Sequence, residues 1–196
     1  MTEPQTETQS GSQHADDLTT VVAEIEGVAA KVDRDSLAVL ADRIHAAPRV
    51  FVAGEGRSGL MGKAFAMRLM HLGLTVYAMG ESITPAVREG DLVVVISGSG
   101  TTAGAVRTAE QAVSAGADTH AVTTDPVSPL ATRANGVLVL PAATKYRRSD
   151  EAPTIQPLSS LFDQATHVAL DVVCLALARR LDVDNERARA THSNTE

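Results

Sequence analysis

The sequence contains no tryptophan, and aromatic residues make up only 3% of its 196 residues. A large core must therefore be built from Ala, Val and Leu, which suits helices packed closely on a parallel sheet. The single cysteine, Cys174, excludes an internal disulfide framework and any metal site made of clustered cysteines. Because Cys174 lies in an apolar helical pattern, we expect a buried, unreactive thiol.

Positive charge is also scarce, since the formal net charge is −7 and no basic cluster exceeds Lys145–Arg148. A nucleic-acid partner needs a basic face, so we predict none. No apolar run reaches membrane-spanning length, and the first residues are polar and lack the apolar segment of a secretory signal. The sequence therefore predicts a cytoplasmic protein with no membrane partner.

Short apolar runs alternate with helical patterns along most of the chain. This alternation predicts an α/β fold, a three-layer sandwich with helices on both faces of a parallel sheet. The expected strands are 49–53, 75–79, 92–96, 119–123 and 136–140, and the expected helices between them are 58–72, 102–116 and 128–134. A final helix is expected over 159–181, after a long polar loop that runs from Pro141 to Pro157.

The length favours one domain, which we assign to residues 18–196. It begins with two helices between residues 18 and 47, separated by a break near 33–35. The polar residues 1–17 are predicted to form a disordered N-terminal tail.

A loop rich in hydroxyl groups follows the third apolar run, and it consists of Ser97, Gly98, Ser99, Gly100, Thr101 and Thr102. Its glycines can turn backbone N–H groups toward an anion, and the following helix N-terminus adds partial positive charge. An ordinary helix cap is the alternative, but one hydroxyl would suffice for a cap. The loop therefore predicts a phosphate-binding site.

A second glycine loop, Gly54–Gly59, follows the first strand and fits the dinucleotide pattern G-x-G-x-x-G. A dinucleotide site is thus an alternative, with Glu81 near the expected place of the ribose-binding acid. However, two loops that could each bind an anion follow neighbouring strands, and this favours one small phosphorylated ligand between them. We therefore expect Gly56, Arg57 and Ser58 to bind this ligand together with the loop 97–102. Arg57 opposes the dipole at a helix start, which an anionic ligand would relieve; a solvated loop arginine is the alternative.

Two further polar residues, Asp163 and His192, have an ordinary structural interpretation. Asp163 lies just inside the final helix, where a capping acid is the plain interpretation. His192 would ordinarily be a residue of the C-terminal tail. No His, Asp and Glu set has metal-ligand spacing, so we predict neither a metal nor a cofactor.

The stretch Arg57–Gly73 resembles the 6-phospho-3-hexuloisomerase family. The resemblance continues, in the family's order, through Thr84-Pro85-Ala86, Gly90-Asp91-Leu92, Ser97–Thr102, Ser160–Gln164 and the ending His192–Glu196. It covers about residues 20–196. It implies a sugar isomerase (SIS) fold with a five-stranded parallel sheet, and homo-oligomers, commonly tetramers (or dimers), with active sites near subunit boundaries.

The resemblance also implies an activity and its residues. The family converts D-arabino-hex-3-ulose 6-phosphate to D-fructose 6-phosphate in the ribulose monophosphate route of formaldehyde fixation. Ser58 and the loop 97–102 match its substrate-binding positions, and Asp163 stands where the family has a glutamate proposed as proton acceptor. We further expect His192, from its own or from a neighbouring subunit, to shuttle protons on the sugar oxygens. Thr191 and Thr195 depart from the family's terminal pattern, which has arginine and leucine there.

Two other functions remain open from the sequence. One is another phosphosugar isomerase of this fold, acting on arabinose 5-phosphate or sedoheptulose 7-phosphate. The other is a non-catalytic sugar-phosphate sensor. Such sensors usually carry a basic helix-turn-helix segment, and residues 1–48 show no sign of one.

Overall fold

The computed structural model of the chain describes residues 7–194, and side chains from residue 16 onward. Five parallel strands form one sheet in the order β2-β1-β3-β4-β5. The strands are β1 (Val50–Gly54), β2 (Val76–Ala78), β3 (Leu92–Ile96), β4 (Asp118–Thr123) and β5 (Gly136–Val139). Each falls within one residue of an apolar run in the sequence, so the predicted α/β fold with a five-stranded parallel sheet is confirmed.

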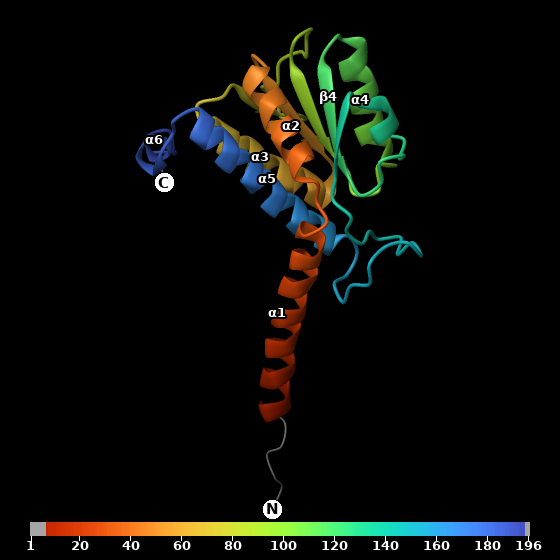
Figure 1. Cartoon of the computed structure of the whole chain (residues 1–196). Helices are drawn as coiled ribbons and strands as arrows, with labels where there is room; N and C mark the ends of the chain where they lie inside the picture. Colours follow the sequence, from red (N-terminus) through yellow and green to blue (C-terminus); the bar gives the residue numbers. More distant parts are fainter. Residues whose placement is uncertain (1–6, 195–196) are drawn as a thin grey trace, which may run out of the picture.

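Helices cover both faces of the sheet, as Figure 1 shows. The helices are α1 (Glu7–Ala29), α2 (Arg34–Ala46), α3 (Gly56–His71), α4 (Ala103–Ser114), α5 (Ser160–Arg180) and α6 (Asn185–Ala190). Alternate residues of β3 enter the two cores: Val94 packs with α2, α3 and α5, and Val95 packs with α4. This is the three-layer sandwich that the alternating pattern predicts.

The α4 side of the sheet explains how a core without tryptophan can be dense. Ala105, Ala109 and Ala112 present one narrow face of α4 to the sheet, and each is at most 3% exposed. Small side chains let the helix backbone approach the strands closely, so little aromatic volume is needed.

Three helical segments differ from the sequence prediction. α1 begins at Glu7 rather than Leu18, so it includes residues assigned to the tail; Gln and Glu are good helix formers even without an apolar stripe. The segment 128–134 forms only a short 3-10 helix, Ala131–Arg133. α6 was not predicted. The division into a tail and one domain stays a prediction, and Thr195 lies outside the described residues.

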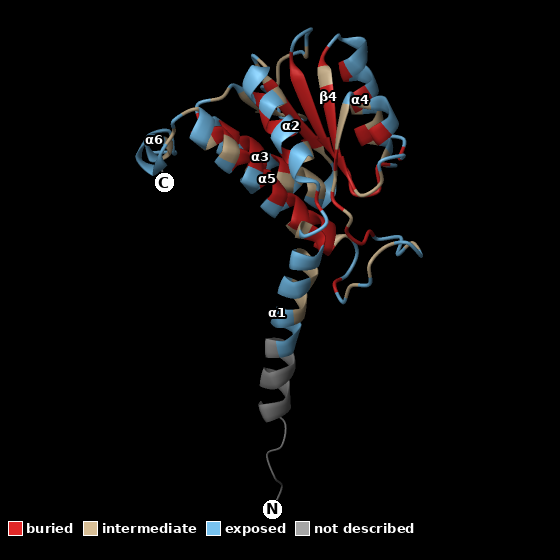
Figure 2. Ribbon diagram, in the orientation of Figure 1, coloured by how far each residue is buried: buried red, intermediate tan, exposed pale blue. Residues whose placement is uncertain are grey.

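α5 is long and apolar enough to cross a membrane by length and composition. However, 56% of its most apolar 18-residue stretch is buried inside the protein, and its buried face packs on α2 and α3 (Figure 2). Cys174 is one of these buried residues, and burial raises the pKa of its thiol to about 12. The helix is thus the central core helix of an α/β domain, and the thiol is inert as expected.

Candidate active site

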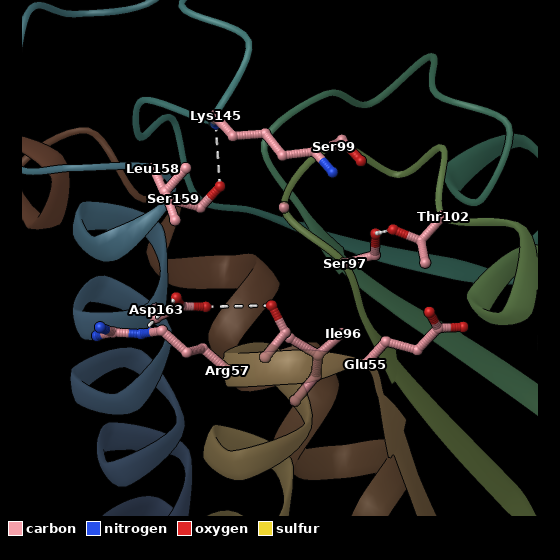
Figure 3. A pocket seen from close by; sticks show the side chains of 12 residues that line it. Glu55, Arg57, Ile96, Ser97, Ser99, Thr102, Lys145, Leu158, Ser159 and Asp163 are labelled. Carbon is pink, nitrogen blue, oxygen red and sulfur yellow. Dashed lines mark hydrogen bonds and ion pairs between the residues drawn. The ribbon is translucent and has the colours of Figure 1, made fainter.

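A pocket of about 230 Å³ opens where the order of the strands reverses, between the carboxyl ends of β1 and β3. Ligands of open α/β sheets bind at this position. Figure 3 shows the side chains that surround it. The lining residues are Glu55, Arg57, Ser58, Ile96, Ser97, Gly98, Ser99, Thr102, Lys145, Leu158, Ser159 and Asp163.

The first glycine loop shapes one wall of this pocket. A Cβ atom on Gly59 would lie 2.6 Å from the Gly54 carbonyl oxygen, so only glycine allows the start of α3 to sit against the end of β1. Gly56 turns the chain at φ 58°, a conformation that glycine adopts freely. The glycines thus place Arg57 and Ser58 in the first turn of α3, beside the pocket.

The dinucleotide alternative is not supported by this topology. The classical dinucleotide sheet has six strands in the order 3-2-1-4-5-6, whereas this sheet has five strands in another order. Glu81, the candidate ribose acid, forms an ion pair with Lys63 of α3 at 2.5 Å. Its carboxylate therefore already has a cationic partner.

The hydroxyl-rich loop 97–102 forms the opposite wall. The Gly98 carbonyl accepts hydrogen bonds from the Thr124 backbone N–H at 3.0 Å and the Thr124 hydroxyl at 2.8 Å. Because the C=O and N–H of a trans peptide point in opposite directions, the Ser99 N–H points away from Thr124. Ser99 also accepts a hydrogen bond from the Thr101 hydroxyl at 2.9 Å. The loop therefore presents N–H and hydroxyl donors in a fixed shape, as an anion site requires.

The same loop touches the start of α5. A Cβ atom on Gly98 would lie 2.9 Å from the Phe162 ring, so the absence of a side chain lets the loop rest on that ring. Asp163 is the next residue along α5. This contact sets the distance between the loop 97–102 and the carboxylate.

Asp163 is the buried acid of the pocket, with only 3% of its surface exposed. Its carboxylate accepts a hydrogen bond from the Ser58 hydroxyl at 3.1 Å and pairs with Arg57 Nε at 3.2 Å. Both of these partners lie on α3 and neither is a backbone N–H at the start of α5, so the plain interpretation as a capping acid is wrong. Burial raises the pKa of the Asp163 carboxyl above its usual value, and Ser58 and Arg57 offset part of that rise. A carboxyl group with a raised pKa suits proton transfer near neutral pH.

The ion pair with Asp163 explains why an arginine, Arg57, stands at the start of α3. Its guanidinium does not simply oppose the α3 dipole, since the Asp163 carboxylate lies beside it. The Arg57 side chain is still 58% exposed, so part of it also faces solvent. The arginine can hold Asp163 ionised and still meet an anionic ligand.

The structure brings together most of the residues that the sequence singled out. Seven of them line the pocket: Arg57, Ser58, Ser97, Gly98, Ser99, Thr102 and Asp163. The pocket lining does not include Gly56, Gly100 or Thr101. These residues belong to the two loops and help to set the backbone conformation of each loop. Gly100, for example, has φ 62°, and a Cβ there would lie 2.1 Å from the Ser128 hydroxyl oxygen. Their individual roles in binding stay predictions.

His192 lies far from this pocket, at the C-terminal end of α3. Its ring stacks on His71, with ring centroids 5.2 Å apart, and Thr191 donates a hydrogen bond to the His71 carbonyl at 2.9 Å. His71 ends α3, whereas Ser58 lies in its first turn. A helix of this length spans about 24 Å, so His192 does not reach the pocket of its own chain.

The pocket is also lined by three polar residues that the sequence did not single out, namely Lys145, Glu55 and Ser159. Lys145 carried a signal, because it begins the largest basic cluster and lies in the long loop 141–157. Among the residues that the structure describes, no three His, Cys, Asp or Glu side chains group as metal ligands.

Comparison with known proteins agrees with this geometry. The SIS domain family matches residues 43–168. The chain is 45% identical to the 3-hexulose-6-phosphate isomerase of Mycobacterium gastri over 186 residues, which cover 95% of this chain and 93% of that protein. It is 38% identical to the 3-hexulose-6-phosphate isomerase of Bacillus subtilis over 176 residues, covering 90% and 95%.

A solved structure from Methanococcus jannaschii, described as inferring a molecular function of 3-hexulose-6-phosphate isomerase, superimposes with a TM-score of 0.81. Its sequence is 29% identical, and the match covers 92% of this chain and 99% of that one. The fold and the pocket at the strand reversal therefore define a SIS-domain protein. Within that class, the chain belongs to the 3-hexulose-6-phosphate isomerase family, another name for 6-phospho-3-hexuloisomerases.

Proposed function

We propose that this protein isomerises D-arabino-hex-3-ulose 6-phosphate to D-fructose 6-phosphate, the reaction of the ribulose monophosphate route of formaldehyde fixation. The observation that carries this proposal is the buried Asp163 carboxylate, held by Ser58 and Arg57 in one pocket with the anion-binding loop 97–102. Curated relatives named for this activity, matched over most of their length, support it.

The reaction moves a carbonyl group from C3 to C2 of the open-chain sugar. Asp163 removes the proton from C2; the electron pair of that C–H bond forms the C2=C3 double bond, and the C3=O π pair moves onto O3 to give an enediolate. The hydroxyl proton of O2 is transferred to O3, the O2 electron pair then forms the C2=O carbonyl, and the C2=C3 pair takes the proton back from the same carboxyl group at C3. One carboxylate on one face of the sugar can perform both carbon steps.

The remaining residues bind and orient the substrate. The loop 97–102 holds the phosphate group, so that its binding energy places C2 and C3 near Asp163. Ser58 and Arg57 lie against the Asp163 carboxylate, where they can stabilise the negative oxygens of the enediolate. His192 would transfer the proton between the sugar oxygens O2 and O3. Because His192 does not reach the pocket of its own chain, it would do so in the pocket of a second subunit.

The test is turnover of hex-3-ulose 6-phosphate with detection of fructose 6-phosphate. Asp163→Asn should lower kcat by about 100- to 10,000-fold, the usual contribution of a general base. Unchanged turnover would overturn the assignment of the base. Arabinose 5-phosphate and sedoheptulose 7-phosphate serve as alternative substrates, and faster turnover of either would replace the proposed substrate.

Sharing of the site between subunits has its own test. Asp163→Asn and His192→Ala chains are each assayed alone and after mixing by joint refolding. Mixed oligomers should regain activity, because some sites then combine an intact Asp163 with an intact His192. Equal activity of His192→Ala and the natural protein would remove His192 from the mechanism.

A further inference from the structure

The pocket contains a cation that the reaction above does not use. Lys145 lies in the loop between β5 and α5, and its side chain extends toward Ser99 of the anion-binding loop (Figure 3). Its ammonium group lies 5.1 Å from the centre of the Tyr146 ring. Among the described residues, no carboxylate lies within ion-pair distance of this ammonium group.

The charges that line the pocket indicate a role for this lysine toward a phosphate ligand. Glu55 and Asp163 supply two negative charges, and Arg57 and Lys145 supply two positive charges. Arg57 is already paired with Asp163. Without Lys145 the lining would be net negative, while a phosphate monoester carries between one and two negative charges near pH 7. Neutral hydroxyl and N–H donors would then bind the phosphate against a repulsive lining.

The backbone around Lys145 is fixed, although its side chain is exposed. The Lys145 N–H donates a hydrogen bond to the Ser159 hydroxyl at 3.0 Å, which ties the lysine to the start of α5. On one side, Glu151 accepts hydrogen bonds from the N–H and hydroxyl of Thr144 at 2.8 and 2.6 Å. On the other side, the Arg147 guanidinium donates to the carbonyls of Thr144, Gln156 and Leu158.

These contacts hold the loop in one shape, so the flexible stem of Lys145 begins from a defined point beside the pocket. A lysine ammonium is a compact point charge on a long stem, suited to following a phosphate group as it binds. We propose that Lys145 is a substrate-binding residue that neutralises the phosphate group held by the loop 97–102. The proposal rests on the proposed function, because it assigns a phosphorylated sugar to the same pocket.

The experiment compares Lys145→Met with Lys145→Arg and with the control Lys63→Met. Lys63→Met removes the same charge, but Lys63 pairs with Glu81 and does not line the pocket. Binding of fructose 6-phosphate, inorganic phosphate and unphosphorylated fructose is measured by calorimetry, together with KM and kcat for hex-3-ulose 6-phosphate. Circular dichroism checks that each variant is folded.

Lys145→Met should weaken binding of fructose 6-phosphate by about 10- to 100-fold, as expected for a charge-assisted contact. The value of KM should rise by a similar factor while kcat changes less, and Lys145→Arg should recover most of the affinity. Lys63→Met should behave as the natural protein does. Equal affinity of Lys145→Met and the natural protein for fructose 6-phosphate would overturn the proposal, as would an equal loss in Lys63→Met.

Failure of the proposed function gives a different result. A natural protein that binds fructose 6-phosphate without isomerising hex-3-ulose 6-phosphate would refute the activity, and the binding comparison would still decide the role of Lys145. A natural protein that binds neither fructose 6-phosphate nor inorganic phosphate would refute both.

Discussion

His120 of β4 makes the stability of this protein sensitive to mild acid. Its side chain is only 1% exposed, and neither ring nitrogen has a hydrogen-bond partner among the described residues. Burial, together with the nearby Arg43 guanidinium, lowers the pKa of His120 from 6.5 to about 4. The folded protein therefore keeps this imidazole neutral over a pH range in which the unfolded chain protonates it.

The sign and size of the effect follow from proton linkage. Between pH 6.5 and about 4 the unfolded state binds one more proton than the folded state, so the free energy of unfolding falls as the pH falls. One pKa unit corresponds to about 1.4 kcal/mol, which gives a loss of about 3 kcal/mol across the whole window. That is a large part of the total stability of an ordinary domain.

The substitution His120→Leu removes the titrating group and the two unpaired nitrogens. Urea denaturation followed by circular dichroism, at one protein concentration and at pH values from 7.5 to 4, measures the free energy of unfolding. We expect His120→Leu to lose about 3 kcal/mol less than the natural protein over this range. The control His45→Leu, at an exposed position of α2, should keep the natural pH dependence. Identical pH slopes for His120→Leu and the natural protein would refute the argument.

Three further predictions concern the site. Glu24 of α1 accepts hydrogen bonds from Thr154, Ile155 and Gln156 of the loop 141–157. Glu24→Gln should therefore loosen this loop and raise KM about 3- to 10-fold, as measured by steady-state kinetics. Limited proteolysis should cut the loop faster in this variant, and an unchanged rate of cleavage would contradict the prediction. Gly98→Ala places a Cβ against the Phe162 ring, so it should destabilise the protein by about 1–3 kcal/mol and lower activity, and an unchanged melting temperature would refute the close contact. The raised pKa of Asp163 predicts that kcat/KM falls on the acid side at a higher pH than for an ordinary aspartate, a limb that must be absent from the residual activity of Asp163→Asn.

The sequence predicted the sheet well, because buried parallel strands are short and nearly all apolar. The run Leu92–Ile96 is an example, since all five residues are buried and the predicted bounds are the observed ones. The start of α1 could not be predicted from periodicity, because its first residues show no apolar stripe. Helix ends that depend on capping and propensity alone are the least certain part of such a prediction.

The site was predictable only in part, for a physical reason. Each loop carries a local signal, and the positive φ of Gly56 and Gly100 matches the glycines that the sequence supplies. The pairing of Ser58 with Asp163 joins residues 105 positions apart, and no local pattern encodes it. The path that brings Lys145 to the pocket depends on Arg147, a non-glycine residue at φ 49° whose side chain binds loop carbonyls. Side-chain hydrogen bonds to backbone carbonyls leave no periodic trace in a sequence.

The departure from the family's glutamate can be tested through the partners of Asp163. The aspartate is one methylene shorter, and in this structure its carboxylate lies against Ser58 at 3.1 Å and Arg57 at 3.2 Å. In Asp163→Glu the carboxylate would lie up to one bond, about 1.5 Å, further into the pocket and would leave these two partners. A double-mutant cycle of Ser58→Ala and Asp163→Glu measures this coupling in kcat/KM. We expect Ser58→Ala to reduce kcat/KM about tenfold in the natural protein and clearly less in Asp163→Glu, since the lost hydrogen bond is then already absent. Equal losses in both backgrounds would mean that Ser58 acts on the substrate alone, and that the shorter acid is not positioned by the start of α3.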